Sequence, residues 1–174
     1  MRLSPTSYHE AGHCLAELCG LPVTKASVVP SRHFGGQVCY EAPTQVGLRA
    51  QTRAGGIAAL LGPIAEAQYT GEDVRDVLDR CDGDLRDARR AATTIAMMHE
   101  TWTPRTRERV FEHLLAAAHR LVCENWQTVT AIAQALQLNG RLAGADIARV
   151  IHLTERQRAA TKGHQQHEHA ISSR

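Results

Sequence analysis

The pentad His9-Glu10-Ala11-Gly12-His13 has the residue types and the spacing of a metal-dependent hydrolytic site. On a helix, residues four apart share one face, so the imidazoles of His9 and His13 can point at one ion. Glu10 then lies beside them, where its carboxylate can act as a general base. The spacing therefore predicts a Zn²⁺ site of the H-E-x-x-H type with Glu10 as the catalytic residue. The simpler alternative is two surface histidines beside a salt-bridging glutamate.

A zinc enzyme of this type needs a third protein ligand and an open coordination position. Residues 14–20 contain no histidine that would complete a metzincin motif, so the third ligand must come from elsewhere. Asp84 follows Gly83 at an expected helix start, where helix-end amides can orient a carboxylate; alternatively, it is a plain N-cap. Glu66 lies in an apolar helical stretch, where an unpaired carboxylate is costly. Glu66 is therefore an alternative ligand, the partner of a ligating histidine, or a partly exposed helix residue.

The elements that must position these residues are mostly helical. A capping serine followed by a proline begins a helix predicted over Pro5–Cys19. Two strands are predicted at Val23–Val29 and Gly36–Glu41, because both are rich in β-branched and aromatic residues. The helical segment Leu48–Tyr69 contains two adjacent glycines and the pair Gly62-Pro63, and we expect it to break or kink there.

The second half of the chain repeats apolar residues at helical spacing. After a polar stretch at 70–83, helices are predicted over Asp84–Met98, over a long run from Pro104 to a stop at Gly140, and over Ala145–His152. Residues 1–152 are expected to form one domain. Residues 153–174 form a polar tail that is expected to be disordered, because it has little to bury. The predicted fold class is mainly α-helical, with a small β-sheet of two or three strands near the active-site helix.

Composition excludes several classes of protein. The 174 residues include 20 basic and 18 acidic side chains, a formal net charge of +2, so nucleic acid is not an expected partner. No stretch is apolar enough to span a membrane and no export signal is visible, so a cytoplasmic protein is expected. The five cysteines include no C-x-x-C pair and are expected to be reduced thiols. Cys81 lies near Asp84 and could be a soft ligand, but a neutral thiol is the preferred interpretation.

Several stretches resemble, in order, the zinc peptidase domain of the FtsH-type ATP-dependent proteases. They are Tyr8–Ala16, Val23–Pro30 with Gly35–Tyr40, Leu61–Ala67, Gly83–Ala88, Glu124–Leu136 and Gly140–Gly144. The resemblance implies that His9 and His13 ligate zinc and that Glu10 is the general base. It also implies that Asp84, in the place of the aspartate of the family's Asn-Asp-Leu motif, is the third ligand. Gly83 replaces the family's asparagine, a difference that touches the surroundings of the ligands rather than the ligands.

The resemblance also implies what the protein acts on. No G-x-x-x-x-G-K-[ST] loop occurs in the chain, so we expect a stand-alone peptidase domain that cleaves unfolded or short polypeptides, or one supplied by a separate ATPase or unfoldase. The strand region formed by Phe34, Gly35, Gly36 and Gln37 is the expected substrate edge, because an extended peptide can add to a free sheet edge. A monomer or a small homo-oligomer is expected.

Two other classes of function compete with an active peptidase. The first is a non-hydrolytic binding or regulatory module that keeps the peptidase fold, with or without the zinc. The second is a helical interaction protein in which the pentad is accidental, and this hypothesis requires Asp84 to lie far from His9 and His13. No side chain is predicted to stabilise an oxyanion, and Tyr8 is expected to pack in the core because it points off the face that carries His9 and His13.

Overall fold

The structure is a computed structural model that describes residues 3–30, 35–41, 47–98 and 103–172, with side chains as far as residue 161. It confirms a mainly α-helical fold with a small three-stranded sheet. The elements are α1 (Pro5–Cys14), the 3₁₀ helix η1 (Leu15–Cys19), β1 (Val23–Ser27), β2 (Gln37–Tyr40), α2 (Leu48–Thr70), α3 (Val74–Arg80), α4 (Asp82–Met97), α5 (Pro104–Glu124), α6 (Trp126–Asn139), β3 (Arg141–Ala143) and α7 (Gly144–Ser172).

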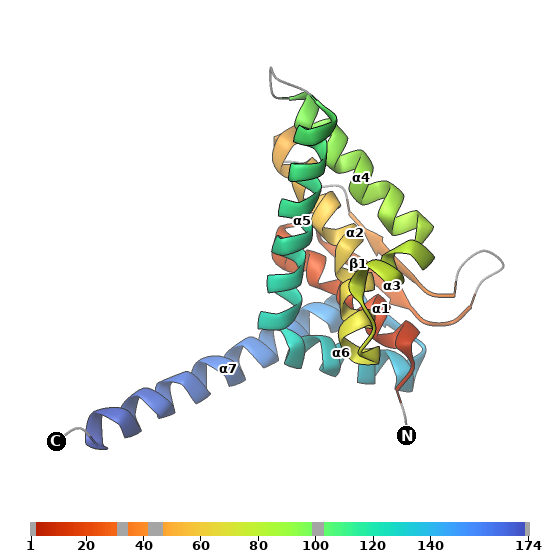
Figure 1. Cartoon of the computed structure of the whole chain (residues 1–174). Coiled ribbons are helices and arrows are strands. Elements are labelled where there is room, and N and C mark those ends of the chain that lie inside the picture. The colour runs from red at the N-terminus through yellow and green to blue at the C-terminus, as the bar shows by residue number, and fades with distance from the viewer. Residues whose placement is uncertain (1–2, 31–34, 42–46, 99–102, 173–174) are drawn as a thin grey trace.

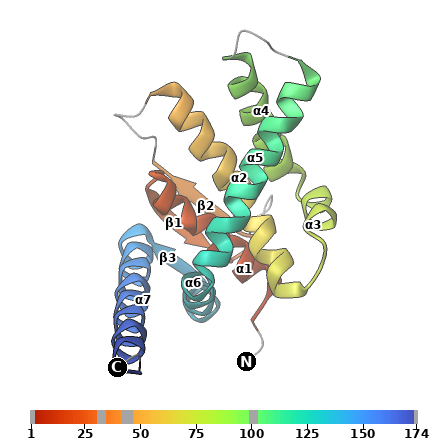
Figure 2. The same ribbon diagram turned by 60° about the vertical axis from the view of Figure 1, so that its left-hand side comes forward.

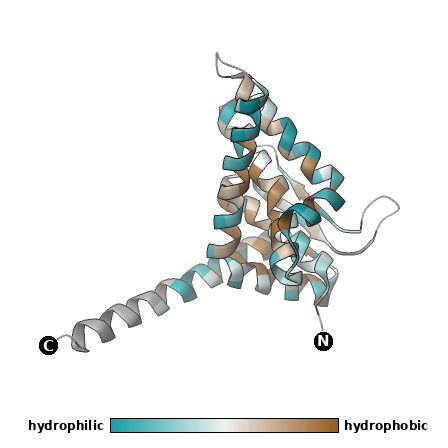
Figure 3. Ribbon diagram, in the orientation of Figure 1, coloured by the Kyte–Doolittle hydropathy of each residue, from teal (hydrophilic) through white to brown (hydrophobic). Residues whose placement is uncertain are grey.

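Helix α2 lies in the middle of the molecule and packs against α1, α3, α4 and α5 (Figures 1 and 2). Apolar residues are concentrated on α2, whereas α4 is largely hydrophilic on its outer side (Figure 3). The predicted break into two helices does not occur, because α2 is continuous from Leu48 to Thr70 with Pro63 inside it. An interior proline costs a helix about 3 kcal/mol, but burial of neighbours such as Leu61 and Ile64 offsets that cost.

The contact between α1 and α2 is close because small residues meet there. Gly12 of α1 lies directly against the carbonyl of Leu61 and the methyl group of Ala65, and a side-chain carbon at Gly12 would overlap both. Helices can approach this closely only where one of them lacks a Cβ. The glycine inside the H-E-x-x-H pentad is therefore a packing residue that brings α1 onto α2.

The sheet has the strand order β2-β1-β3, with β1 antiparallel to both neighbours. Strand β2 therefore forms an edge of this sheet, as the predicted substrate strand requires. Strand β3 was not among the two predicted segments, because three residues are too few to show an alternating pattern. It follows Gly140, whose left-handed φ of 70° ends α6 and turns the chain back toward β1.

Two further elements differ from the sequence prediction. Helix α3 lies within the polar stretch 70–83, where only Val77 and Leu78 are buried and no apolar period is visible. The last helix, predicted to end at His152, continues to Ser172 and projects from the body of the molecule (Figure 1). Good helix formers from Glu155 to Ala160 favour its continuation, and Thr154 and Arg158 bond to the hydroxyl of Thr128 and the carbonyl of Glu124. The division into a domain at 1–152 and a tail at 153–174 stays a prediction.

None of the described helices combines the length and the apolar character that a bilayer span requires.

Candidate metal centre

Two histidines of α1 and an aspartate of α4 converge, although the two helices are distant in the sequence. The Nε2 atoms of His9 and His13 lie 3.1 Å apart. Asp84 places Oδ2 at 3.2 Å from Nε2 of His9 and Oδ1 at 3.5 Å from Nε2 of His13. A tetrahedral zinc ion with bonds of about 2.0–2.2 Å holds its ligand atoms about 3.3–3.6 Å apart. The distances between the three predicted ligands, 3.1–3.5 Å, come within about 0.2 Å of that spacing. The accidental-pentad hypothesis required Asp84 to lie far from the two histidines, and Asp84 instead contacts both.

Hydrogen bonds to Nδ1 orient both imidazoles. Nδ1 of His9 lies 2.8 Å from Oε2 of Glu66, and Nδ1 of His13 lies 2.8 Å from the carbonyl oxygen of Ala58. Because a carbonyl and a carboxylate only accept, both Nδ1 atoms donate, so Nε2 is the nitrogen of each ring that can bind a metal ion. The two Nε2 atoms and the Asp84 carboxylate face one point, which a proton or a metal ion can occupy. A partner on Nδ1 is the usual support of a metal-bound histidine.

The pKa values of the converging groups are displaced by their mutual contacts. Burial by itself lowers the pKa of His9, but hydrogen bonds with Asp84, Cys81 and Glu66 outweigh burial and raise that pKa to about 12. Burial by itself raises the pKa of Asp84, but hydrogen bonds from His13 and His9 hold it well below its ordinary value. The hydrogen bond from His9 likewise lowers the pKa of Glu66. The centre therefore strongly favours a positive charge between its carboxylates, whether a proton or a metal ion carries it.

Glu10 lies beside this centre on α1 and is 5% exposed. Its carboxylate lies against Gly36, and a side-chain carbon at Gly36 would overlap it. Burial raises the pKa of Glu10, while the charges of His13 and His9 oppose that rise. The predicted general base thus lies between the imidazole pair and the beginning of β2, in a setting that favours proton uptake.

Gly62 and Pro63 shape α2 around His13. The His13 ring lies directly against Gly62, where a side-chain carbon would overlap the ring. The carbonyl of Ala58, one turn before Gly62, accepts the bond from His13. The Gly62-Pro63 pair, which we interpreted as a helix break, therefore lies inside a continuous helix, and Gly62 leaves room for the His13 ring.

A cavity of about 760 Å³ opens over the centre. His9, Glu10, His13 and Asp84 line it, and so do three of the predicted substrate-strand residues, Gly35, Gly36 and Gln37. Phe34, the fourth, lies outside the described residues. The cavity thus joins the edge strand to the candidate metal ligands.

The structure separates the roles of the remaining candidates. Glu66 contacts Nδ1 of His9, the position expected for the partner of a ligating histidine. Tyr8 packs as expected, stacking on Tyr69 with ring centroids 3.9 Å apart. Sequence reasoning missed Tyr40, which lines the cavity and donates from its hydroxyl to the carbonyl of His13 at 3.4 Å. The one sequence signal for Tyr40 is its position in the predicted strand that follows Gly35 and Gly36.

No protein-family model and no curated protein matches this chain. The resemblance to the FtsH-type peptidase domain therefore stays a prediction from sequence motifs.

Proposed function

We propose that the protein is a zinc-dependent metalloendopeptidase that hydrolyses peptide bonds in unfolded or short polypeptides. The observation that carries the proposal is the convergence of His9, His13 and Asp84 on one point, with the Glu10 carboxylate in the same cavity. The donor chemistry fits zinc, since two imidazole nitrogens and one carboxylate leave a coordination position free for substrate.

Each residue then has a defined task. His9, His13 and Asp84 would hold Zn²⁺, which when bound supplies a Lewis acid that polarises a carbonyl and acidifies water. Glu10 accepts the proton of the attacking water and later delivers it to the leaving amine. Glu66 and the carbonyl of Ala58 fix the two rings, so the site needs little reorganisation during the reaction.

The substrate class follows from the edge strand. An extended peptide can pair with the backbone of β2 next to Glu10, because Gly36, which has no side chain, lets the start of that strand lie directly against the carboxylate. Folded proteins do not offer such an extended segment, so the proposed substrates are unfolded or short chains. A cytoplasmic location, a separate ATPase or unfoldase that supplies substrates, and a monomeric or small homo-oligomeric state belong to the same proposal.

The test compares metal content and cleavage in matched variants. We expect wild type to bind one zinc ion per chain and to cleave casein, and we expect Glu10→Gln to keep the zinc while cleavage falls by about 10²–10⁴-fold. His13→Ala should lose the zinc as well as the activity. Bound zinc without any Glu10-dependent cleavage of unfolded substrates would favour the non-hydrolytic binding or regulatory module. The absence of stoichiometric zinc from wild type would contradict the proposal.

A further inference from the structure

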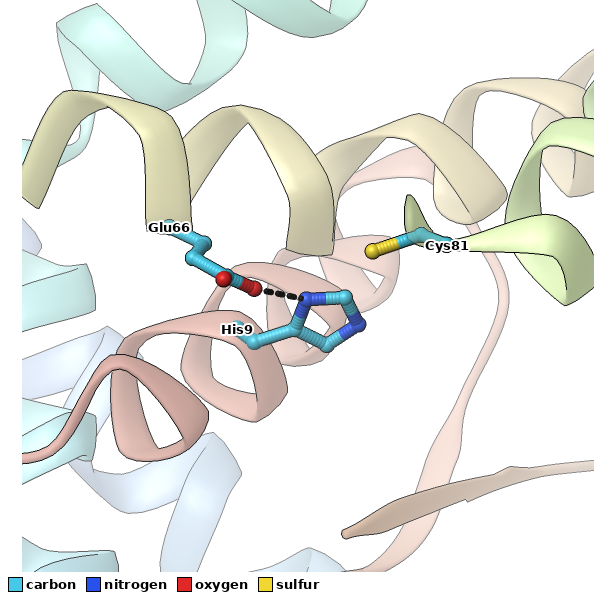
Figure 4. A group of neighbouring side chains, drawn as sticks. All are labelled: His9, Glu66 and Cys81. Atoms are coloured by element: carbon cyan, nitrogen blue, oxygen red, sulfur yellow. Dashed lines mark hydrogen bonds and ion pairs between the residues drawn. The ribbon is translucent and has the colours of Figure 1, made fainter. Parts of the chain in front are cut away.

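A second set of metal-ligating side chains shares His9 with the proposed zinc centre. The donor atoms of His9, Glu66 and Cys81 all lie within 4.8 Å of one another. Figure 4 shows that Glu66 and the Cys81 sulfur both point toward the His9 ring. The three residues come from α1, from α2 and from the position directly before α4. This second set is distinct from the first, because it contains neither His13 nor Asp84.

The second set can close around one ion with small side-chain movements. A tetrahedral divalent ion bound by nitrogen, oxygen and sulfur at about 2.0–2.3 Å holds its donors about 3.3–3.8 Å apart, so donors within 4.8 Å of one another have to approach by about 1 Å at most. His9, Glu66 and Cys81 all line the 760 Å³ cavity, and each is partly exposed, so an ion can reach them from solvent.

Arg80 approaches the oxygen of Glu66 that points away from His9. Its guanidinium lies 2.7 Å from Glu72 and 3.8 Å from Oε1 of Glu66, whereas Oε2 faces His9. A cation at the second set would therefore use Oε2, on the side of the carboxylate away from the arginine contact.

The two donor sets differ in chemical softness. His9, His13 and Asp84 offer only nitrogen and oxygen, whereas Cys81 adds a sulfur, and thiolate ligands select soft or borderline ions. The second set is therefore matched to a thiophilic cation.

We propose that His9, Glu66 and Cys81 form a second binding position, for a thiophilic cation such as Cd²⁺, which competes with the zinc position for His9. The cation takes the lone pair of Nδ1 of His9, an oxygen of Glu66 and the sulfur of Cys81. The Nδ1 proton and the thiol proton leave to solvent while Nε2 of His9 keeps its proton, so the ring is neutral and one divalent ion replaces two protons. His9 then loses the acceptor that orients it toward His13 and Asp84, a consequence that rests on the proposed zinc site.

The binding step is tested by titrating the metal-free protein with Cd²⁺ and recording the ultraviolet absorption of the cadmium–thiolate bond. The zinc centre contains no sulfur, so this band reports the second position alone. We expect the band in wild type and in Asp84→Asn, and its loss in Cys81→Ser.

Cys123 provides the matched control. It is exposed, and its sulfur lies 3.6 Å from Nδ1 of His119, so it is a thiol–imidazole pair outside the cavity. Cys123→Ser should keep the band. A band that persists in Cys81→Ser, or one that Cys123→Ser abolishes, would overturn the second position.

Competition is tested by adding Cd²⁺ to the zinc-loaded protein and measuring released zinc with a chromogenic chelator. Because even the loss of a residue that only supports a ligand weakens a metal site by about 10–100-fold, we expect the loss of the ligand itself in Cys81→Ser to require at least about tenfold more Cd²⁺ for the same release. A cadmium–thiolate band without zinc release would overturn the competition. A wild type that binds no zinc contradicts the proposed function, while the band still decides the second position.

Discussion

The hydrogen bond between His9 and Glu66 is the contact that orients the ring of His9, one of the proposed zinc ligands. Without the Glu66 carboxylate as acceptor, the His9 ring can rotate or change its tautomer. We therefore expect Glu66→Ala to weaken zinc binding by about 10–100-fold, as measured by competition with a chromogenic chelator. Glu72→Ala is the matched control, because Glu72 also pairs with Arg80 but does not contact His9. Equal losses in both variants would contradict this role of Glu66.

The pH dependence of zinc binding follows from the same residues. The pKa of His9 is raised to about 12, so His9 carries an extra proton at neutral pH, whereas the lowered pKa of Asp84 keeps that group ionised. Zinc must displace the His9 proton, so the apparent affinity should rise with pH, by about tenfold per pH unit between about pH 6 and pH 8. Calorimetry in two buffers of different ionisation enthalpy should show about one proton released. A pH-independent affinity without proton release would contradict the protonation state that we assign to His9.

At the scale of the element, α2 needs a residue without a side chain at Gly62, where the His13 ring of α1 packs against it. Gly62→Ala places a methyl group against the His13 ring, so we expect a destabilisation of about 1–3 kcal/mol together with weaker zinc binding. Gly55→Ala in the same helix meets no atom within 4 Å and should stabilise the protein by about 0.5–1 kcal/mol. Urea unfolding and zinc titration of both variants measure these effects. Equal stability and equal zinc affinity in the two variants would contradict the close packing of the His13 ring against Gly62.

The beginning of β2 has a similar pair of glycines. Gly36→Ala would push the Glu10 carboxylate aside, whereas a methyl group at Gly35 meets no atom within 4 Å. Displacement of a catalytic group by about 1 Å can cost about 10²-fold in rate. We therefore expect Gly36→Ala to lose activity on a short peptide by at least about tenfold with its zinc content unchanged, and Gly35→Ala to stay near wild type. Loss of zinc in Gly36→Ala would place the effect on the ligands instead.

At the scale of the whole molecule, the proposed metal centre would connect helices that are distant in the sequence. His9 and His13 belong to α1, Asp84 belongs to α4, and Glu66 adds α2 through its hydrogen bond to His9. Zinc at about 100 times its dissociation constant stabilises the native state by about 2.7 kcal/mol, so chelation should lower the Tm by roughly 5–11 °C. Glu10→Gln should show the same shift, because Glu10 is not a ligand. A Tm that does not change on chelation would contradict the proposal that bound zinc connects α1 and α4.

Much of the architecture could be predicted because its signals are local. Ser4 caps α1 through its side chain, Thr103 caps α5 in the same way, and Gly140 ends α6 in the left-handed conformation. Caps and stops depend on residues within one helical turn, which the sequence displays directly. The pairing of His9 with His13 on one face follows from the same short-range periodicity.

The sequence by itself determined the helix that carries His9, Glu10 and His13, and it reduced the acidic partners to Asp84 and Glu66. Only the tertiary structure decided which acid meets both Nε2 atoms and which one supports a ring, because that choice depends on how α1, α2 and α4 pack. It also decided that Gly62-Pro63 lies inside a continuous helix and that Cys81 lies next to His9. Contacts between distant segments form only when the core assembles, and no local pattern of residues encodes their distances.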